Sequence, residues 1–223
     1  MIDNLFKRVS HVNDEGIMRE LLLDFESSSR VKPNHIIIFR DGVSESQFNQ
    51  VLNIELDQMM QACKFLDEKW DPKFTVIIAQ NNHHTRFFQT RGPDNVPPGT
   101  INDSNICHLQ NNDFYLCARA GMIGTTRPTH YHVLYDEIGF STDDLQELVH
   151  SLSSVYQRST TAISVVAPIC YAHWAAAQMG TMMKFEDMSE TSSSHGGITT
   201  SGPVPVPPMP KLNKNVATST FFC

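Results

Sequence analysis

No apolar stretch in this sequence is long enough to cross a lipid bilayer, and its first residues include Asp3, Lys7 and Arg8. A membrane-spanning helix needs about 20 consecutive, mainly apolar residues, and a secretory signal peptide needs a shorter apolar core behind a basic start. We therefore expect neither a membrane anchor nor a signal peptide.

Cysteine is scarce, and no two cysteines have Cys-x-x-Cys spacing. The five are Cys63, Cys107, Cys117, Cys170 and Cys223. An odd, scattered set favours neither a disulfide framework nor a zinc ribbon. We therefore expect the protein in a reducing compartment, the nucleus or the cytoplasm.

Basic residues are fewer than acidic ones: 17 Lys and Arg against 24 Asp and Glu, a formal net charge of -7. Dedicated nucleic-acid-binding domains are usually basic, so the charge of the whole chain argues against one. Any contact with phosphate must come from a local group of arginines. Candidates at predicted strand ends, loops and helix ends are Arg86, Arg91, Arg119, Arg127 and Arg158, although scattered surface arginines are the simpler explanation.

Several catalytic signatures are absent as well. The sequence has no Walker loop and no GxGxxG, GxSxG or Cys-His nucleophile pattern, so nucleotide hydrolysis, dehydrogenation and covalent hydrolysis lack support. Ten histidines, including His83-His84 and the pair His130/His132, suggest zinc by their number. None of them has the spacing of an HExxH motif or a Cys/His finger, so a dedicated zinc site is not favoured.

What is present is a chain of 223 residues, 40% hydrophobic, which is enough to bury a core. After Phe185 the composition changes to Ser, Thr, Gly and Pro, with PVPVPPMP at 203–210. Such a segment is too polar and too rich in proline to pack. We predict one domain over 1–185, a flexible connector over 186–214 and a docked, more apolar segment over 215–223.

The first part of the domain predicts a helix followed by a strand. Ile17, Leu21 and Phe25 share one face at helical spacing. The apolar run at 36–39 indicates a strand buried on both faces, as in parallel or mixed sheets covered by helices.

A second helix and a second strand follow. Ser44 and Gln47 form a capping-box pattern ahead of an apolar stripe that extends to Leu66, and a further apolar strand is predicted at 74–79. Two strands that flank one helix make a βαβ unit. The predicted fold class is therefore α/β.

The later elements alternate in the same way. We predict loops at 90–112 and 121–128, strands at 114–117 and 131–135, a helix capped by Ser141, and a helix with Pro168 in its first turn.

Two residues are candidates for chemistry by position. Asp41 follows a predicted strand, where α/β proteins place ligands and catalytic groups, although Asp41-Gly42 also has the composition of a simple turn. His173 lies in an apolar helix, where a buried imidazole needs a hydrogen-bond partner or a metal. A hydrogen-bonded core histidine is the plainer alternative.

Four segments carry a closer resemblance: IIIFRDGVSESQF at 36–48, HHTRFF at 83–88, NNDFYLCARAGMIGTTRPTHYHVLYDE at 111–137 and APICYAHWAAAQ at 167–178. They resemble the Piwi domain of Argonaute proteins, and the likeness extends over essentially the whole chain. The TSSSHGG segment and the FFC ending are similar to the plant clade associated with heterochromatic small RNAs. The resemblance implies an RNase H-like Piwi domain, truncated at its N-terminal side, with a mixed sheet flanked by helices.

The resemblance also implies the site of a Mg²⁺-dependent endoribonuclease in small-RNA-guided silencing. The family holds two divalent ions with an Asp, Glu, Asp, His set, of which Asp41 in RDGVSE and His173 in YAH match the second aspartate and the histidine. The other two acids would precede Met1. Because one aspartate and one histidine bind Mg²⁺ weakly, we expect little cleavage from this chain alone.

Guide binding is the second implied property. Arg86 and Arg127 match family positions that contact the guide backbone, Arg158 matches one near the guide 5′ phosphate, and Gln178 stands where many relatives have an arginine near that phosphate. Such contacts supply affinity without reading bases, because guide-target pairing selects the sequence. The implied partners are a small guide RNA and a complementary target RNA.

A surface that binds partner proteins is the third implied property. Piwi domains of the family bind Trp-Gly peptides, and Phe25, Lys32 and Leu66 match part of that surface, whereas Glu26 departs from an aromatic residue of some relatives. The alternative function is therefore a non-catalytic module that binds RNA or Trp-Gly proteins. An RNase H-like nuclease of another family, such as an integrase, is disfavoured by the length of the matched segments.

Overall fold

The computed structural model describes residues 5–108, 111–121 and 124–182. The chain divides into two compact units, residues 1–169 and 170–223, and each is described by itself. The predicted connector at 186–214 and the predicted docked segment at 215–223 lie outside the described residues.

Within the described ranges, no helix combines the length and the apolar character that a bilayer crossing requires.

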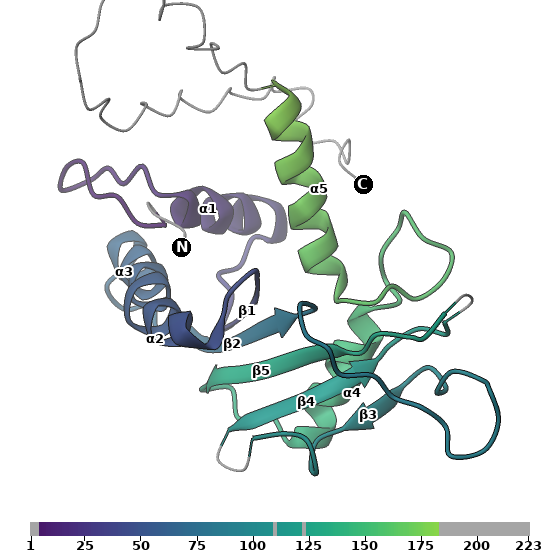
Figure 1. Ribbon diagram of the computed structural model, residues 1–223. Helices are drawn as coiled ribbons and strands as arrows, with labels where there is room; N and C mark the ends of the chain where they lie inside the picture. Colours follow the sequence, from purple (N-terminus) through teal and green to yellow (C-terminus); the bar gives the residue numbers. More distant parts are fainter. Residues whose placement is uncertain (1–4, 109–110, 122–123, 183–223) are drawn as a thin grey trace, which may run out of the picture. The chain divides into compact units, whose positions relative to one another are not determined.

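A five-stranded mixed sheet is the centre of the first unit (Figure 1). Its strands lie in the order β1-β2-β5-β4-β3. β1 and β2 run parallel, and the other neighbouring pairs run antiparallel. The predicted βαβ unit and the α/β class are therefore confirmed. The strand bounds are His35–Asp41 (β1), Lys73–Gln80 (β2), Thr100–Asn102 (β3), Asn112–Cys117 (β4) and Thr129–Asp136 (β5).

The helix between β1 and β2 is continuous but changes its winding. It passes through a 3₁₀ turn (η1, Glu45–Gln47), an α turn (α2, Phe48–Gln50), a π segment (η2, Val51–Leu56) and an α-helix (α3, Asp57–Leu66). The predicted capping box is present, and the amide nitrogen of Ser44 donates to Gln47 Oε1 at 3.1 Å. The π segment was not predicted, because residue types carry no signal for one extra residue in a helical turn.

The first predicted helix is α1, Ile17–Ser29. Ile17, Leu21 and Phe25 do share one face, but that face is exposed. The exposed fractions of the three residues are 46%, 61% and 45%, respectively. The buried face carries Met18 and Leu22 instead, which pack into a core shared with α3 and β2.

Two predictions about strands were wrong. Residues 36–40 of β1 are half-buried instead of buried on both faces, because β1 is an edge strand of the described sheet and pairs with β2 alone. β3 lies inside the stretch predicted as a loop at 90–112. With three residues and one aliphatic side chain, Ile101, β3 is too short to give an alternating pattern.

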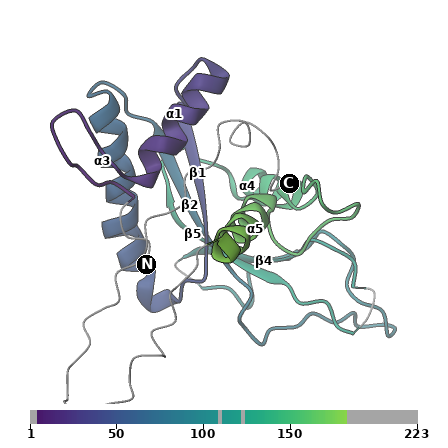
Figure 2. The same ribbon diagram turned by 90° about the horizontal axis from the view of Figure 1, so that it is seen from above.

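The last two helices match their predicted starts. In α4, Thr142–Leu152, the Asp144 amide donates to the Ser141 hydroxyl at 3.1 Å. In α5, Ala167–Met182, Pro168 occupies the first turn. Helices α1 and α3 lie on one side of the sheet and α4 on the other (Figure 2). The sheet is thereby covered on both faces.

Candidate nucleic-acid interface

Asp41 is the last residue of β1 and pairs in register with Ala79 of β2. The chain turns directly after it, because Gly42 has φ of +71°, a conformation that glycine adopts without steric cost. The Gly42 amide donates to Asp41 Oδ1 at 2.7 Å. Asp41 therefore lies at the carboxyl-terminal edge of the parallel pair, as predicted.

A largely buried ion pair supports this turn from the side of the crossover helix. Arg40 Nε donates to Glu55 Oε2 at 3.0 Å, and Arg40 Nη2 donates to Glu55 Oε1 at 3.3 Å. Glu55 lies in the π segment and is 1% exposed. A third donor of Arg40, Nη1, reaches the carbonyl oxygen of Asp41 at 2.5 Å. The two-pronged contact fixes the guanidinium plane, and with it the backbone that carries Asp41.

A cavity of about 820 Å³ opens at the same edge of the sheet. Asn81, which follows β2, lines one wall, and Arg119 and Arg127 line others. Thr125 and Ser164, which carry hydroxyl groups, also line the cavity. The cavity therefore combines two guanidinium groups with short polar side chains, a composition suited to phosphate oxygens.

Asn95 holds the wall that carries Arg119. Its Nδ2 donates to the carbonyl oxygens of Gly121 at 3.2 Å and Gly124 at 2.7 Å, and its Oδ1 accepts from the Thr126 amide at 2.8 Å. A Cβ atom on Gly121 would lie 2.1 Å from Thr126 Oγ1. A side chain at residue 121 would therefore displace Thr126 or Asn95 from these contacts.

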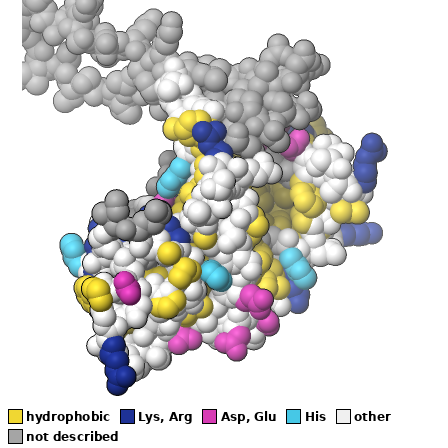
Figure 3. Space-filling view, turned by 90° about the vertical axis from the view of Figure 1, so that its right-hand side faces the viewer, with side chains coloured by type: hydrophobic (Ala, Val, Ile, Leu, Met, Phe, Trp, Pro, Cys, Tyr) yellow, Lys and Arg dark blue, Asp and Glu magenta, His cyan; other side chains and the backbone are white. Residues whose placement is uncertain are grey.

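The positive charge of this cavity is local. Arg119 and Arg127 are exposed, and Arg127 Nη1 reaches the carbonyl oxygen of Asn81 at 3.4 Å. On the face shown in Figure 3, basic side chains form separate groups and several acids gather elsewhere. The net charge of -7 is therefore compatible with a local group of basic side chains.

The other predicted RNA-binding residues of the first unit do not line the cavity. Arg86 is half-buried, and its Nη1 donates to the carbonyl oxygens of Thr85 at 2.7 Å and His83 at 3.5 Å. Arg158 is exposed. Arg119 was a candidate by its position in a loop, but the resemblance gave it no role. The structure is what adds Arg119 to the site.

His173 and Gln178 belong to the second unit. His173 is exposed, whereas the apolar helix predicted a buried imidazole. The described part of that unit is one helix, which gives the ring no core of its own. Because Asp41 belongs to the first unit, the binding of one ion by Asp41 and His173 stays a prediction.

Asp113, His130 and His132 form a buried cluster on β4 and β5, and each is less than a tenth exposed. Two ligands of one zinc ion lie roughly 3.3 Å apart when metal-ligand bonds are about 2.0–2.1 Å long. His130 Nε2 and Asp113 Oδ2 are 2.6 Å apart, the separation of a charge-assisted hydrogen bond. The geometry is that of a hydrogen-bonded pair.

The two histidine rings contact each other and the rings of Tyr115 and Phe48. Tyr115 lies over His130 at 3.9 Å between ring centroids, His130 approaches His132 at 3.8 Å, and Phe48 meets His132 edge-on at 5.1 Å. Burial, together with the neighbouring His130, lowers the pKa of His132 to about 4. His132 is therefore neutral at physiological pH. Sequence spacing hinted at this cluster, since residues 130 and 132 share one face of a strand.

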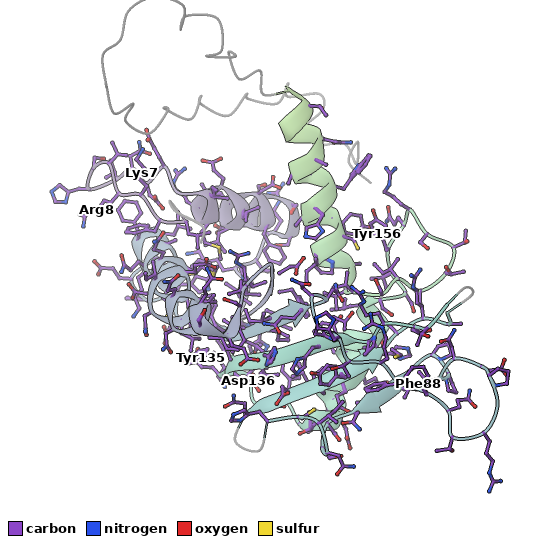
Figure 4. The ribbon with its side chains drawn as sticks, viewed as in Figure 1. Lys7, Arg8, Phe88, Tyr135, Asp136 and Tyr156 are labelled. Atoms are coloured by element: carbon purple, nitrogen blue, oxygen red, sulfur yellow. The ribbon has the colours of Figure 1, made fainter. Side chains whose placement is uncertain are left out.

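Asp136 is at the opposite end of the sheet from Asp41 and has a structural role. It ends β5 (Figure 4), accepts from Thr75 Oγ1 at 2.5 Å, and accepts from the amides of Gly139 at 3.1 Å and Phe140 at 2.8 Å. Burial raises the pKa of Asp136, but these hydrogen bonds outweigh it and leave the pKa lowered. Asp136 holds a turn and is no substitute for a second acid beside Asp41.

The residues predicted for a partner peptide differ in their availability. Phe25 is 45% exposed on α1. Lys32 is engaged with Asp67, with Nζ 2.7 Å from Oδ2, and lies over the Trp70 ring at 5.6 Å. Leu66 packs against the core. Phe25 is thus the member of the set with the most open surface.

Comparison with known proteins places this chain in a family. The Piwi domain family matches residues 2–184. The chain is 82% identical to protein argonaute 9 and 72% identical to protein argonaute 4, both of Arabidopsis thaliana, over its full length. It spans about a quarter of the length of these curated relatives, 25% and 24%.

Solved structures of Argonautes support the same family assignment. The C-terminal lobe of a budding yeast Argonaute superimposes with a TM-score of 0.69 at 32% identity, over 73% of this chain and 36% of that one. Kluyveromyces polysporus Argonaute with a guide RNA gives 0.68 at 30% identity, over 73% and 20%. The mixed sheet flanked by helices is accordingly the RNase H-like fold that the resemblance implied. The chain belongs to the Piwi domain family, and its closely similar relatives include Argonautes of plants.

Proposed function

We propose that this chain is the guide- and target-binding portion of an Argonaute that acts in small-RNA-guided silencing and cuts RNA with Mg²⁺ in its complete form. The supporting observation is the arginine-lined cavity at the sheet edge that also carries Asp41. A single-stranded guide presents regularly spaced phosphates, and two guanidinium groups on one cavity can contact them without reading bases. The structure of the Kluyveromyces polysporus relative was solved with a guide RNA, which supports the same ligand class.

Asp41 suits magnesium in donor type. Its carboxylate is half-exposed at the end of β1, and Mg²⁺ prefers such hard oxygen ligands. Among the described residues, the cluster of three or more possible ligands is Asp113, His130 and His132, which does not include Asp41. In the proposed enzyme Asp41 and His173 would hold the metal together with further acids. Bound magnesium supplies activation of water and stabilisation of the leaving oxygen.

The first experiment tests phosphate binding on the 223-residue chain. Fluorescence anisotropy with a short labelled single-stranded RNA should show weaker binding for Arg119→Ala and Arg127→Ala, by about tenfold for each charge-assisted contact that is lost. Arg91→Ala is the matched control, because Arg91 is exposed and does not line the cavity. Equal affinities for all four proteins would exclude the cavity as the RNA site.

The second experiment tests Asp41 in a full-length Argonaute that carries this sequence. With guide, target and Mg²⁺, Asp41→Ala should remove cleavage while guide binding persists, since Asp41 does not line the cavity. Cleavage by Asp41→Ala at the unaltered rate would remove Asp41 from the mechanism.

A non-catalytic partner-binding role is the second candidate, favoured by the exposed apolar face of α1 that includes Phe25. A tryptophan side chain needs apolar walls and a place for its indole N–H. Titration of a Trp-Gly peptide against the chain and its Phe25→Ala variant tests this role, and Val12→Ala, at an exposed residue outside α1, is the control. The same affinity for Phe25→Ala would count against the surface.

A further inference from the structure

Gln80 links the sheet to the turn after Asp41. It is the last residue of β2, next to Ala79, which pairs with Asp41. Its Nε2 donates to the carbonyl oxygen of Val43 at 2.9 Å. Its Oε1 lies 3.2 Å from Nε2 of His132. One side chain thus contacts the Asp41 turn and the buried histidine cluster at the same time.

These two contacts determine each other. A backbone carbonyl can only accept a hydrogen bond, so the Gln80 amide must direct its NH₂ group to Val43. Its oxygen then faces His132, and an amide oxygen can only accept. His132 must therefore carry its proton on Nε2. The orientation of the Gln80 amide and the tautomer of His132 form one arrangement.

The surroundings hold His132 in place. It is 5% exposed and lies between the rings of His130 and Phe48, and His130 is hydrogen-bonded to Asp113 at 2.6 Å. A neutral imidazole carries one proton, and the acceptor offered to Nε2 decides which nitrogen has it. Gln80 therefore has a rigid neighbour.

The Asp41 turn needs this external support. Gly42 has φ of +71°, and glycine restricts its own backbone less than any other residue. The direction of the Asp41 carboxylate then depends on the Gly42 amide, which donates to Oδ1, and on groups that hold the residues around it. Before Asp41, Arg40 is held by its ion pair with Glu55. After Asp41, the buried Val43 accepts a hydrogen bond from Gln80 through its carbonyl oxygen.

We propose that Gln80 is a positioning residue for the Asp41 carboxylate and that His132, as its Nε2-protonated tautomer, orients the Gln80 amide. The functional part of this inference rests on the proposed role of Asp41 in RNA cleavage. The structural part concerns the turn alone and can be measured without cleavage.

NMR of the 223-residue chain tests the structural part. The imidazole ¹⁵N spectrum of His132 should show protonation at Nε2. Gln80→Glu keeps an acceptor for His132 but sets a carboxylate oxygen against the Val43 carbonyl, so the amides of Gly42 and Ser44 should exchange with solvent about tenfold faster. Gln61→Glu, at an exposed residue of α3, is the matched control. An Nδ1-protonated His132, or turn amides that are unchanged in Gln80→Glu, would overturn the proposal.

Cleavage by a full-length Argonaute that carries this sequence tests the functional part. Gln80→Glu should cut about 10- to 100-fold more slowly at unchanged guide affinity, since small misplacements of a catalytic group have effects of that size. Asp41→Asn, run in parallel, reports on the proposed function. If Asp41→Asn still cleaves, the proposed function is wrong, and NMR still decides whether Gln80 fixes the turn. If Asp41→Asn is inactive and Gln80→Glu cuts normally, the positioning role is wrong.

Discussion

His132 couples the stability of the fold to pH. Burial lowers the pKa of His132 from 6.5 to about 4. Between these two pH values the unfolded chain binds a proton at His132 and the folded chain does not. Above pH 6.5 the ring is neutral in both states and its full contribution to stability is present. As pH falls from 6.5 to 4, only the unfolded state gains the proton, and the free energy of unfolding decreases.

We therefore expect the free energy of unfolding, measured by urea denaturation, to fall between pH 6.5 and 4 and to fall less steeply in His132→Gln. Glutamine has no titrating group but can still donate to Gln80. His84→Gln, at an exposed histidine, is the control substitution. A His132→Gln curve parallel to that of the unaltered chain would mean that His132 takes up its proton equally in both states.

The Arg40–Glu55 pair is the second feature at this scale with a measurable energy. Glu55→Gln removes one charge and leaves the Arg40 guanidinium, 19% exposed in its side chain, without its carboxylate. Breaking one partner of a buried pair costs about 3–5 kcal/mol. Urea denaturation should show a loss toward the lower end of that range, whereas Glu68→Gln, at an exposed residue, should show almost none. Equal stability of the two variants would mean that water already satisfies Arg40.

The sequence was informative about Asp41 and much less so about its neighbours. Asp41 follows an apolar run, and that position favoured the edge of the sheet while leaving a simple turn as the alternative. Gln80 and His132 are 52 residues apart, and Arg40 and Glu55 are 15 apart. The contacts within these two pairs depend on strand register and on a π segment, and neither of these leaves a signal in residue spacing. The role of Gln80 therefore became visible only in the fold.

At the scale of elements, the order of apolar segments and the helix-capping patterns gave correct predictions. The βαβ unit, the capping box and the starts of α4 and α5 are all present. The misses share a cause, because each depends on what lies beside the element: β1 is half-buried since it is an edge strand, and β3 exists since β4 offers it a partner. Periodicity reports what a segment prefers, whereas burial depends on its neighbours.

The start of α4 allows a direct test of capping. Ser141 Oγ accepts from the Asp144 amide, and replacing a serine cap by alanine costs about 1 kcal/mol. Ser141→Ala should therefore lower the free energy of unfolding by about that amount. Ser154→Ala, an exposed serine beyond the end of α4, is the comparison. A loss for Ser141→Ala no larger than for Ser154→Ala would show that water replaces the cap.

At the scale of the whole molecule, the net charge of -7 means that the proposed RNA binding depends on the cavity arginines. Binding of single-stranded RNA weakens with salt, and each phosphate contact contributes about 0.7 to the slope of log K against log salt concentration. Arg119→Ala combined with Arg127→Ala should therefore reduce that slope by about 1.4, twice the single-contact value. A slope unaltered by the double substitution would mean that neither arginine displaces counterions, whatever the change in affinity at one salt concentration.

The edge position of β1 affects how the isolated chain behaves at high concentration. β1 is rich in isoleucine. Among the described residues, no strand pairs with the backbone on its outer side. Unpaired peptide groups in a regular row are a template on which another polypeptide can add a strand. Purified alone, the chain should thus tend to aggregate with itself through that row, unless a neighbouring strand caps it.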